Sequence, residues 1–122
     1  RTADGHSVAL GAVEPKFWQA FCIAAQRSDW IARMDDPLPQ TDLQGELEDY
    51  FAGLTLQQCN ERFGAVDCCF NQVLELHDAV NTPHMQARRL VVDAGHGNIQ
   101  ALYPAYVDGQ PPAVREPFRD PH

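Results

Sequence analysis

Hydrophobic residues recur along this chain with two different spacings, and the spacing changes at Glu14. Residues 7–13, SVALGAV, form a short apolar run without helical periodicity, which predicts a strand. From Pro15 to about Gln26 the apolar positions lie three or four residues apart, which predicts a helix. Proline suits the first turn of a helix and pushes the residue before it toward extended geometry. The strand should therefore end near Glu14, with the carboxylate at the N-terminus of the helix.

Two further helices are predicted after a loop that contains Asp35, Asp36 and two prolines. Each begins with a capping-box pattern, a threonine followed three residues later by a glutamine. The pairs are Thr41 with Gln44 and Thr55 with Gln58. Apolar stripes at helical spacing follow both pairs, and Gly64 is expected to end the second helix. Asp35, Asp36 and Asp42 are interpreted as loop and cap residues.

The second half of the chain predicts shorter elements. Residues 66–74 should be extended and lead into a short helix near Leu76 to Val80, and Thr82 with Pro83 should start another turn toward Arg88. RLVVDA and NIQALYP, separated by GHG, predict a β-hairpin. The proline-rich residues 108–122 are expected to form an extended tail. We therefore predict a single α+β domain over residues 1–122, with a small antiparallel sheet and several helices packed beside it.

Charge and length exclude several classes of function. The 122 residues carry a formal net charge of −8, and a protein that binds nucleic acid or an anionic membrane should show a basic patch. We therefore expect neither nucleic acid nor a membrane as a partner. No apolar run approaches the roughly 18 residues needed to cross a bilayer. Because the first residue is Arg1 and not Met, the chain is expected to be a piece of something longer.

The four cysteines are Cys22, Cys59, Cys68 and Cys69. No C-x-x-C pair occurs, so a structural zinc site is poorly supported and we expect no bound metal. We interpret all four as reduced packing residues, which places the protein in the cytoplasm.

Few residues look catalytic by themselves. The chain has no glycine-rich phosphate loop, no G-x-S-x-G and no H-E-x-x-H. The histidines are scattered and are expected to be surface or capping residues: His6, His77, His84, His96 and His122. Glu14 leaves two interpretations open. A helix N-terminus favours an acid for structural reasons alone, but strand-to-helix junctions are also common places for functional groups.

Two longer stretches carry a resemblance to a known family. VALGAVEPKFWQAFC, residues 8–22, resembles the segment that opens the small domain of family III CoA-transferases, the CaiB/BaiF group. FGAVDCCFNQVLELHDAVNTPHMQARRLVV, residues 63–92, resembles a family stretch in which D-A-C-x-x-P-V-L precedes E-A-x-x-x-P-H-x-x-A-R-G. The resemblance extends over roughly residues 4–114 and is greatest to the alpha-methylacyl-CoA racemase-like branch.

This resemblance implies part of an acyl-CoA enzyme with a CoA thioester as substrate and no tightly bound cofactor. The main catalytic residues and most of the CoA site would lie in a large domain absent from this chain, and the complete protein would form an interlocked homodimer. Glu14 matches the glutamate of the family's G-A-[IV]-E-P-x-[FY] motif, which lies beside a catalytic histidine of the large domain. The resemblance thus makes Glu14 a supporting acid in an active site that this chain completes.

Three functions stay open on this reading. The first is a racemase or isomerase acting at the alpha carbon of a CoA thioester, the second a CoA-transferase, and the third a non-catalytic assembly domain. The isolated chain is expected to be inactive. Gln72 stands where the family usually has proline and Arg89 where it usually has glycine. Arg89 matters more if that position needs a positive φ, which disfavours a side chain.

Overall fold

The computed structural model describes residues 1–95 and 97–115. The chain folds into two compact units, Arg1–Val73 and Leu74–His122, which are described separately below. His96, expected at the tip of the hairpin, and His122 lie outside the described residues, as do residues 116–122 of the predicted tail. The single domain predicted over residues 1–122 stays a prediction.

A two-stranded antiparallel sheet joins the two ends of the first unit. Strand β1, Ser7–Leu10, pairs with β2, Phe70–Val73, so that Ser7 lies opposite Val73 and Leu10 opposite Phe70. Gln72 lies within β2, opposite Val8.

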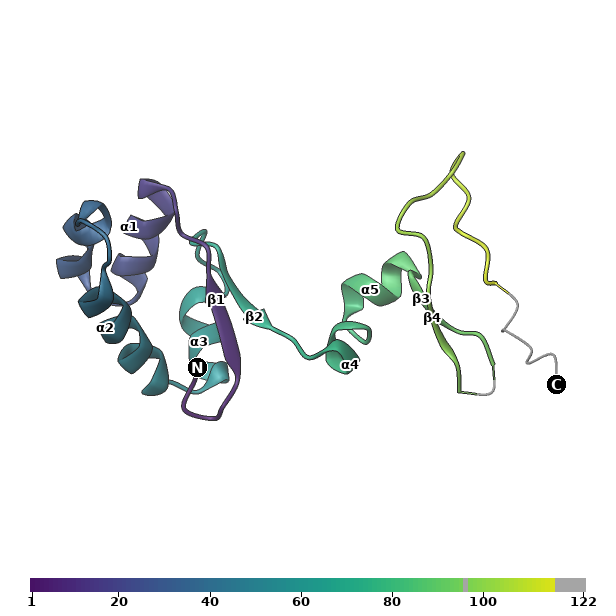
Figure 1. Ribbon diagram of the computed structural model, residues 1–122, viewed down its shortest axis with the longest axis horizontal. Coiled ribbons are helices and arrows are strands. Elements are labelled where there is room, and N and C mark those ends of the chain that lie inside the picture. Colours follow the sequence, from purple (N-terminus) through teal and green to yellow (C-terminus); the bar gives the residue numbers. More distant parts are fainter. Residues whose placement is uncertain (96, 116–122) are drawn as a thin grey trace. The chain divides into compact units, whose positions relative to one another are not determined.

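Four helices lie between these strands in the sequence and cover one side of the sheet (Figure 1). They are α1 (Pro15–Ala24), the 3₁₀ helix η1 (Ser28–Asp35), α2 (Thr41–Ala52) and α3 (Leu56–Phe63). Helix α1 starts at the predicted proline and ends before Gln26, whose φ of 59° leaves the helical region.

The two predicted capping boxes have different outcomes. At Thr55 the box is present, with the Thr55 hydroxyl accepting from the Gln58 amide and the Gln58 side chain accepting from the Thr55 amide. At Thr41 the prediction is wrong, because Thr41 is already inside α2 and Gln40 is the N-cap residue. The Gln40 side-chain amide donates to the carbonyls of Met34 and Asp36 at 3.1 and 2.7 Å. Gln40 thus binds the preceding loop through its side chain, and the helix begins one residue later, at Thr41.

The core of the first unit is built from aromatic side chains. Phe21, fully buried, has its ring centroid 5.2 to 6.2 Å from those of four other aromatic residues. The four are Trp18, Trp30, Phe51 and Phe63. Cys22, Cys59 and Cys68 are buried in the same cluster. Burial of this much apolar surface is what holds α1, η1, α2 and α3 together.

The second unit contains two short helices and a hairpin. Helix α4 is Leu76–Ala79 and α5 is Pro83–Arg88, and Thr82 caps α5 by accepting from the Met85 amide. Strands β3, Val91–Asp93, and β4, Ile99–Ala101, pair antiparallel as predicted. Arg89 ends α5 with φ 50° and ψ 36°, so the position does adopt the left-handed geometry that favours glycine.

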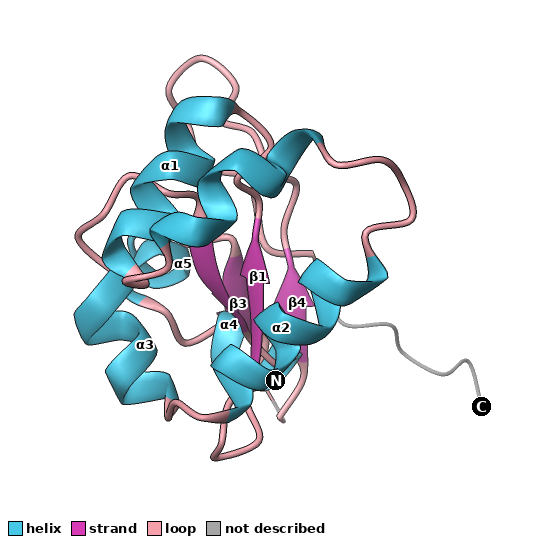
Figure 2. Ribbon diagram, turned by 90° about the vertical axis from the view of Figure 1, so that its left-hand side faces the viewer, coloured by secondary structure: helices cyan, strands magenta, loops and turns pink. Residues whose placement is uncertain are grey.

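The α+β class is confirmed, and Figure 2 shows the helices and strands by colour. In residues 1–95 and 97–115 the strands form two separate two-stranded sheets and not the one sheet that was predicted. The difference arises because β1 pairs with β2, which is about sixty residues away in the sequence, whereas β3 pairs with β4 through a short turn. Within the described residues, no helix has the length and apolar character needed to cross a bilayer.

Candidate functional site at the β1–α1 junction

Glu14 occupies the N-cap position of α1. Its backbone is extended, with φ −100° and ψ 144°, and its carbonyl accepts from the amides of Phe17 and Trp18 at 3.0 Å each. Pro15 follows as the first helical residue and has no N–H to donate. Glu14 therefore lies at the N-terminus of the helix, as the sequence predicts.

The junction around Glu14 is held from both sides. Before it, the Gly11 amide donates to the Cys69 carbonyl at 2.9 Å, and Ala12 is buried in the core. After it, Trp18 is buried and its indole N–H donates to the Trp30 carbonyl at 3.0 Å. The backbone of Glu14 thus lies between a strand and a helix that are both anchored in the core.

The Glu14 carboxylate is not used to cap the helix. No side-chain hydrogen bond from Glu14 to the first turn is present, although Asp or Ser at this position would commonly make one. The nearest cation is Lys16, with Nζ 3.6 Å from Oε2 of Glu14, and the two side chains are 68% and 59% exposed. Such an exposed pair contributes little to stability. The carboxylate can therefore accept a hydrogen bond from a group outside this chain or stabilise an external cation.

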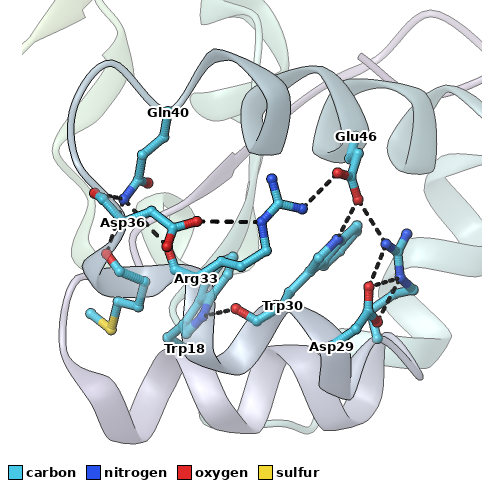
Figure 3. A network of polar contacts seen from close by, with 9 residues as sticks. Trp18, Asp29, Trp30, Arg33, Asp36, Gln40 and Glu46 are labelled. Atoms are coloured by element: carbon cyan, nitrogen blue, oxygen red, sulfur yellow. Dashed lines mark hydrogen bonds and ion pairs between the residues drawn. The ribbon is translucent and has the colours of Figure 1, made fainter.

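Glu46 has the most strongly perturbed carboxylate among the described residues. Its Oε2 accepts from the Trp30 indole N–H and from Arg27 Nη2, each at 2.8 Å, and its Oε1 accepts from Arg33 Nη1 at 2.6 Å (Figure 3). These hydrogen bonds, that of Trp30 first, lower the pKa of Glu46 to about 2. Perturbed acids often mark active sites. Here both oxygens are already occupied by η1 and the residue preceding it, so Glu46 joins α2 to that segment.

Sequence reasoning missed this network because the predicted helix ended near Gln26 and the residues after it were assigned to a loop. The available signal was the helical spacing of Trp30, Ile31 and Met34. Arg27 also lies over the Trp30 ring, 3.9 Å from its centroid, which adds a cation–π contact.

The cysteines are placed as packing residues. Cys22, Cys59 and Cys68 are buried and unpaired, and Cys69 is half-buried and unpaired. Burial raises the pKa of the Cys22 thiol to about 11 and raises those of Cys59 and Cys68. A buried thiol with a raised pKa is a poor nucleophile. No group of three metal-ligating side chains occurs within residues 1–95 and 97–115.

His77 and His84 are on different helices, as the break at Thr82 and Pro83 predicts. Nε2 of His77 lies 2.9 Å from Oδ1 of Asp78 in an exposed pair. The structure does not place these histidines in one metal site. Glu14, in the first unit, is therefore an exposed acidic side chain whose backbone is anchored between β1 and α1.

The fold and this placement define a small α+β module with an exposed carboxylate, not used as a helix cap, at a strand-to-helix junction. Residues 1–121 match the model of CoA-transferase family III. The chain belongs to this family.

Curated relatives include the alpha-methylacyl-CoA racemases of Mus musculus and Homo sapiens. Each is 26% identical over 122 residues, which cover 99% of this chain and 32% of the relative. The chain thus spans about a third of the length of the curated relatives it matches.

Solved structures with the same fold include the hypothetical protein Rv3272 from Mycobacterium tuberculosis, at 22% identity and a TM-score of 0.73. The match covers 95% of this chain and 34% of that one. An orthorhombic form of Rv3272 gives 23% identity and a TM-score of 0.72, over 95% of this chain and 35% of that one. At these identities the likeness concerns the fold.

Proposed function

We propose that this chain is part of an acyl-CoA racemase or isomerase that acts at the alpha carbon of a CoA thioester. The chain would complete an active site whose principal proton-transfer groups belong to a large domain outside residues 1–122. The observation that supports this proposal is Glu14, a carboxylate fixed at the β1–α1 junction and left unused by the helix that it precedes. The sequence similarity to alpha-methylacyl-CoA racemases points to the same chemistry.

The reaction would proceed by removal and return of one proton. A base takes the proton alpha to the thioester carbonyl, which leaves an enolate, and an acid returns a proton to the opposite face of the same carbon. A histidine of the large domain would be one of these two groups. Glu14 would accept a hydrogen bond from that imidazole, orient the ring and stabilise its protonated form, as acid partners of histidine do in other enzymes. Glu14 is therefore proposed as a positioning residue.

The test is alpha-proton exchange by the complete protein in deuterated water. A 2-methylacyl-CoA of single configuration is incubated with the wild type, with Glu14→Gln and with Glu48→Gln, an exposed acid of α2. We expect Glu14→Gln to slow deuterium incorporation at least tenfold with unchanged circular dichroism, and Glu48→Gln to leave the rate unchanged. Equal rates for all three proteins would refute the role of Glu14.

The same family model supports a second function, transfer of CoA between carboxylic acids. Incubation of the complete protein with one acyl-CoA and several free acids separates the two functions. New thioesters would identify a transferase, whereas inversion at the alpha carbon without new thioesters would identify a racemase. If neither occurred, a non-catalytic assembly role would be favoured.

The proposal has three corollaries. The 122-residue chain alone would show no turnover, because the proton-transfer pair would be missing. The complete protein would be an interlocked homodimer that uses the CoA thioester as substrate and needs no tightly bound cofactor. Its location would be the cytoplasm, a compartment in which the four unpaired cysteines stay reduced.

A further inference from the structure

The two units differ in how completely they bury their own apolar side chains. In the first unit the buried cluster contains large residues from all four helices, among them Trp18, Trp30, Phe51 and Phe63. Among residues 74–95 and 97–115, Leu90 is the one apolar side chain that is buried, with 9% exposed. The second unit therefore has almost no hydrophobic core of its own.

An open apolar groove takes the place of that core. It has a volume of about 730 Å³ and lies entirely within the second unit. Its apolar walls come from α4, the turn after it, α5 and the hairpin: Leu76, Val80, Met85, Val91, Ile99 and Ala101. Leu76 and Ile99 are 80% and 69% exposed, so the groove is lined by large side chains that face solvent. Glu75 and His77 provide the polar part of its lining.

None of the strand residues of the hairpin, Val91–Asp93 and Ile99–Ala101, is buried. Val91 lies opposite Ala101 in the register, and Ile99, opposite Asp93, lies two pairs further along on the same face. An isolated two-stranded hairpin is marginally stable in water and needs a third layer against its apolar face. The groove is the place where this layer is missing, because the apolar face of the hairpin forms one of its walls.

We infer that the groove is the docking surface for another part of the same polypeptide, one that lies outside residues 1–122 and presents an apolar helix or strand. The length of the relatives favours this occupant, since this chain corresponds to only 32% of each racemase and two thirds of their sequence is available to fill the groove. The inference rests on the proposed function, which requires a large domain. It adds that the second unit is stabilised when this surface is covered, whereas the first unit has its own core.

Hydrogen exchange followed by mass spectrometry tests the inference on the complete protein and on the 122-residue chain. Leu76→Ser removes an apolar wall of the groove. Leu38→Ser is the matched control, because Leu38 is 84% exposed in the first unit and lies outside the groove. Peptides from α2 and α3 report whether the first unit remains folded in each variant.

We expect peptides covering 91–101 to exchange at least tenfold more slowly in the complete protein than in the 122-residue chain. Leu76→Ser should remove this protection in the complete protein, with α2 and α3 still protected, and Leu38→Ser should retain it. Equal exchange of 91–101 in the complete protein and the short chain would overturn the inference, as would equal behaviour of the two variants. Protection in the short chain that grows with protein concentration would identify a second copy as the occupant and would also overturn it.

This measurement is independent of catalysis. A complete protein without racemase or transferase activity, but with a protected hairpin that Leu76→Ser exposes, would refute the proposed reaction and support the docking surface. An active racemase with an unprotected hairpin would support the proposed reaction and refute the docking surface.

Discussion

Trp30 and Glu46 are sixteen positions apart in the chain, yet the indole N–H of Trp30 donates to the Glu46 carboxylate at 2.8 Å. Trp30 is fully buried, and its carbonyl accepts from the Trp18 indole at 3.0 Å. Two hydrogen bonds donated by indole groups therefore connect α1, η1 and α2. Because Arg27 and Arg33 bind the same carboxylate, this contact combines a buried aromatic ring with a charged network at the surface.

We expect Glu46→Gln to lower the stability of the first unit. The amide keeps the size of the side chain but loses its charge, so each arginine loses one of its two ion pairs and keeps the one to Asp29 or Asp36. The Trp30 indole can also be left without an acceptor. Urea denaturation followed by tryptophan fluorescence measures the midpoint. Glu48→Gln, on the exposed side of α2, is the control and should leave the midpoint unchanged; equal midpoints for both variants would contradict the prediction.

The contribution of Glu46 should depend on pH. The pKa of this carboxyl is about 2 in the folded chain, against an ordinary value near 4.5, so the folded state favours the ionised form. Its stabilising effect is present above the ordinary pKa and is lost as the pH falls from about 4.5 toward about 2. The difference in urea midpoint between wild type and Glu46→Gln should be constant near neutral pH and should shrink in acid. A difference that stays constant down to the acid limit would refute this assignment.

Phe21→Ala should be among the most damaging single changes in the first unit. Phe21 is fully buried and its ring contacts four aromatic neighbours, so the truncation leaves a cavity at the centre of the cluster. Such changes cost about 3 to 5 kcal/mol of unfolding free energy. Ile23→Ala, two residues along α1 and 58% exposed, should cost less than about 0.5 kcal/mol. Chemical denaturation of both variants gives the comparison, and similar losses would show that α1 is placed incorrectly.

Arg89→Gly and Arg88→Gly should act in opposite directions. Arg89 has φ 50°, where a side chain is disfavoured, so glycine should stabilise the C-terminus of α5 by up to about 1 kcal/mol. Arg88 is the last helical residue, where glycine should cost up to about 1 kcal/mol. Hydrogen exchange of α5 in the complete protein measures both effects. A loss of protection in both variants would mean that the Arg89 side chain has a role that outweighs its backbone strain.

Cys69 should be the first cysteine to react with iodoacetamide at neutral pH. It is half-buried, whereas Cys22, Cys59 and Cys68 are buried and have raised pKa values. Peptide mass spectrometry after timed alkylation identifies the modified thiols, and Cys69→Ser should remove the fast phase. Early alkylation of Cys22 would be inconsistent with its position in the core.

The elements that local chemistry controls could be predicted from the sequence. Pro15 sets the start of α1, and Thr82 with Pro83 sets the start of α5, because a cap or a proline acts on its own first turn. The hairpin of β3 and β4 was predictable for the same reason. The α+β class followed from these elements, and the family followed from motif order over most of the chain.

The tertiary structure decided which partners meet across longer separations. Residues 28–35 are held in place by Trp30, which is buried against α1, and by Glu46 of α2, which accepts from Arg27, Trp30 and Arg33. Which residues of α1 and α2 would make these contacts could not be predicted from the segment itself. Gln40 displaced Thr41 as the cap because its side chain found carbonyls of the preceding loop. For Glu14, the sequence determined the position at the helix N-terminus. Only the structure showed that the carboxylate is left uncapped, because a side chain's hydrogen-bond partner depends on neighbours that the fold brings near.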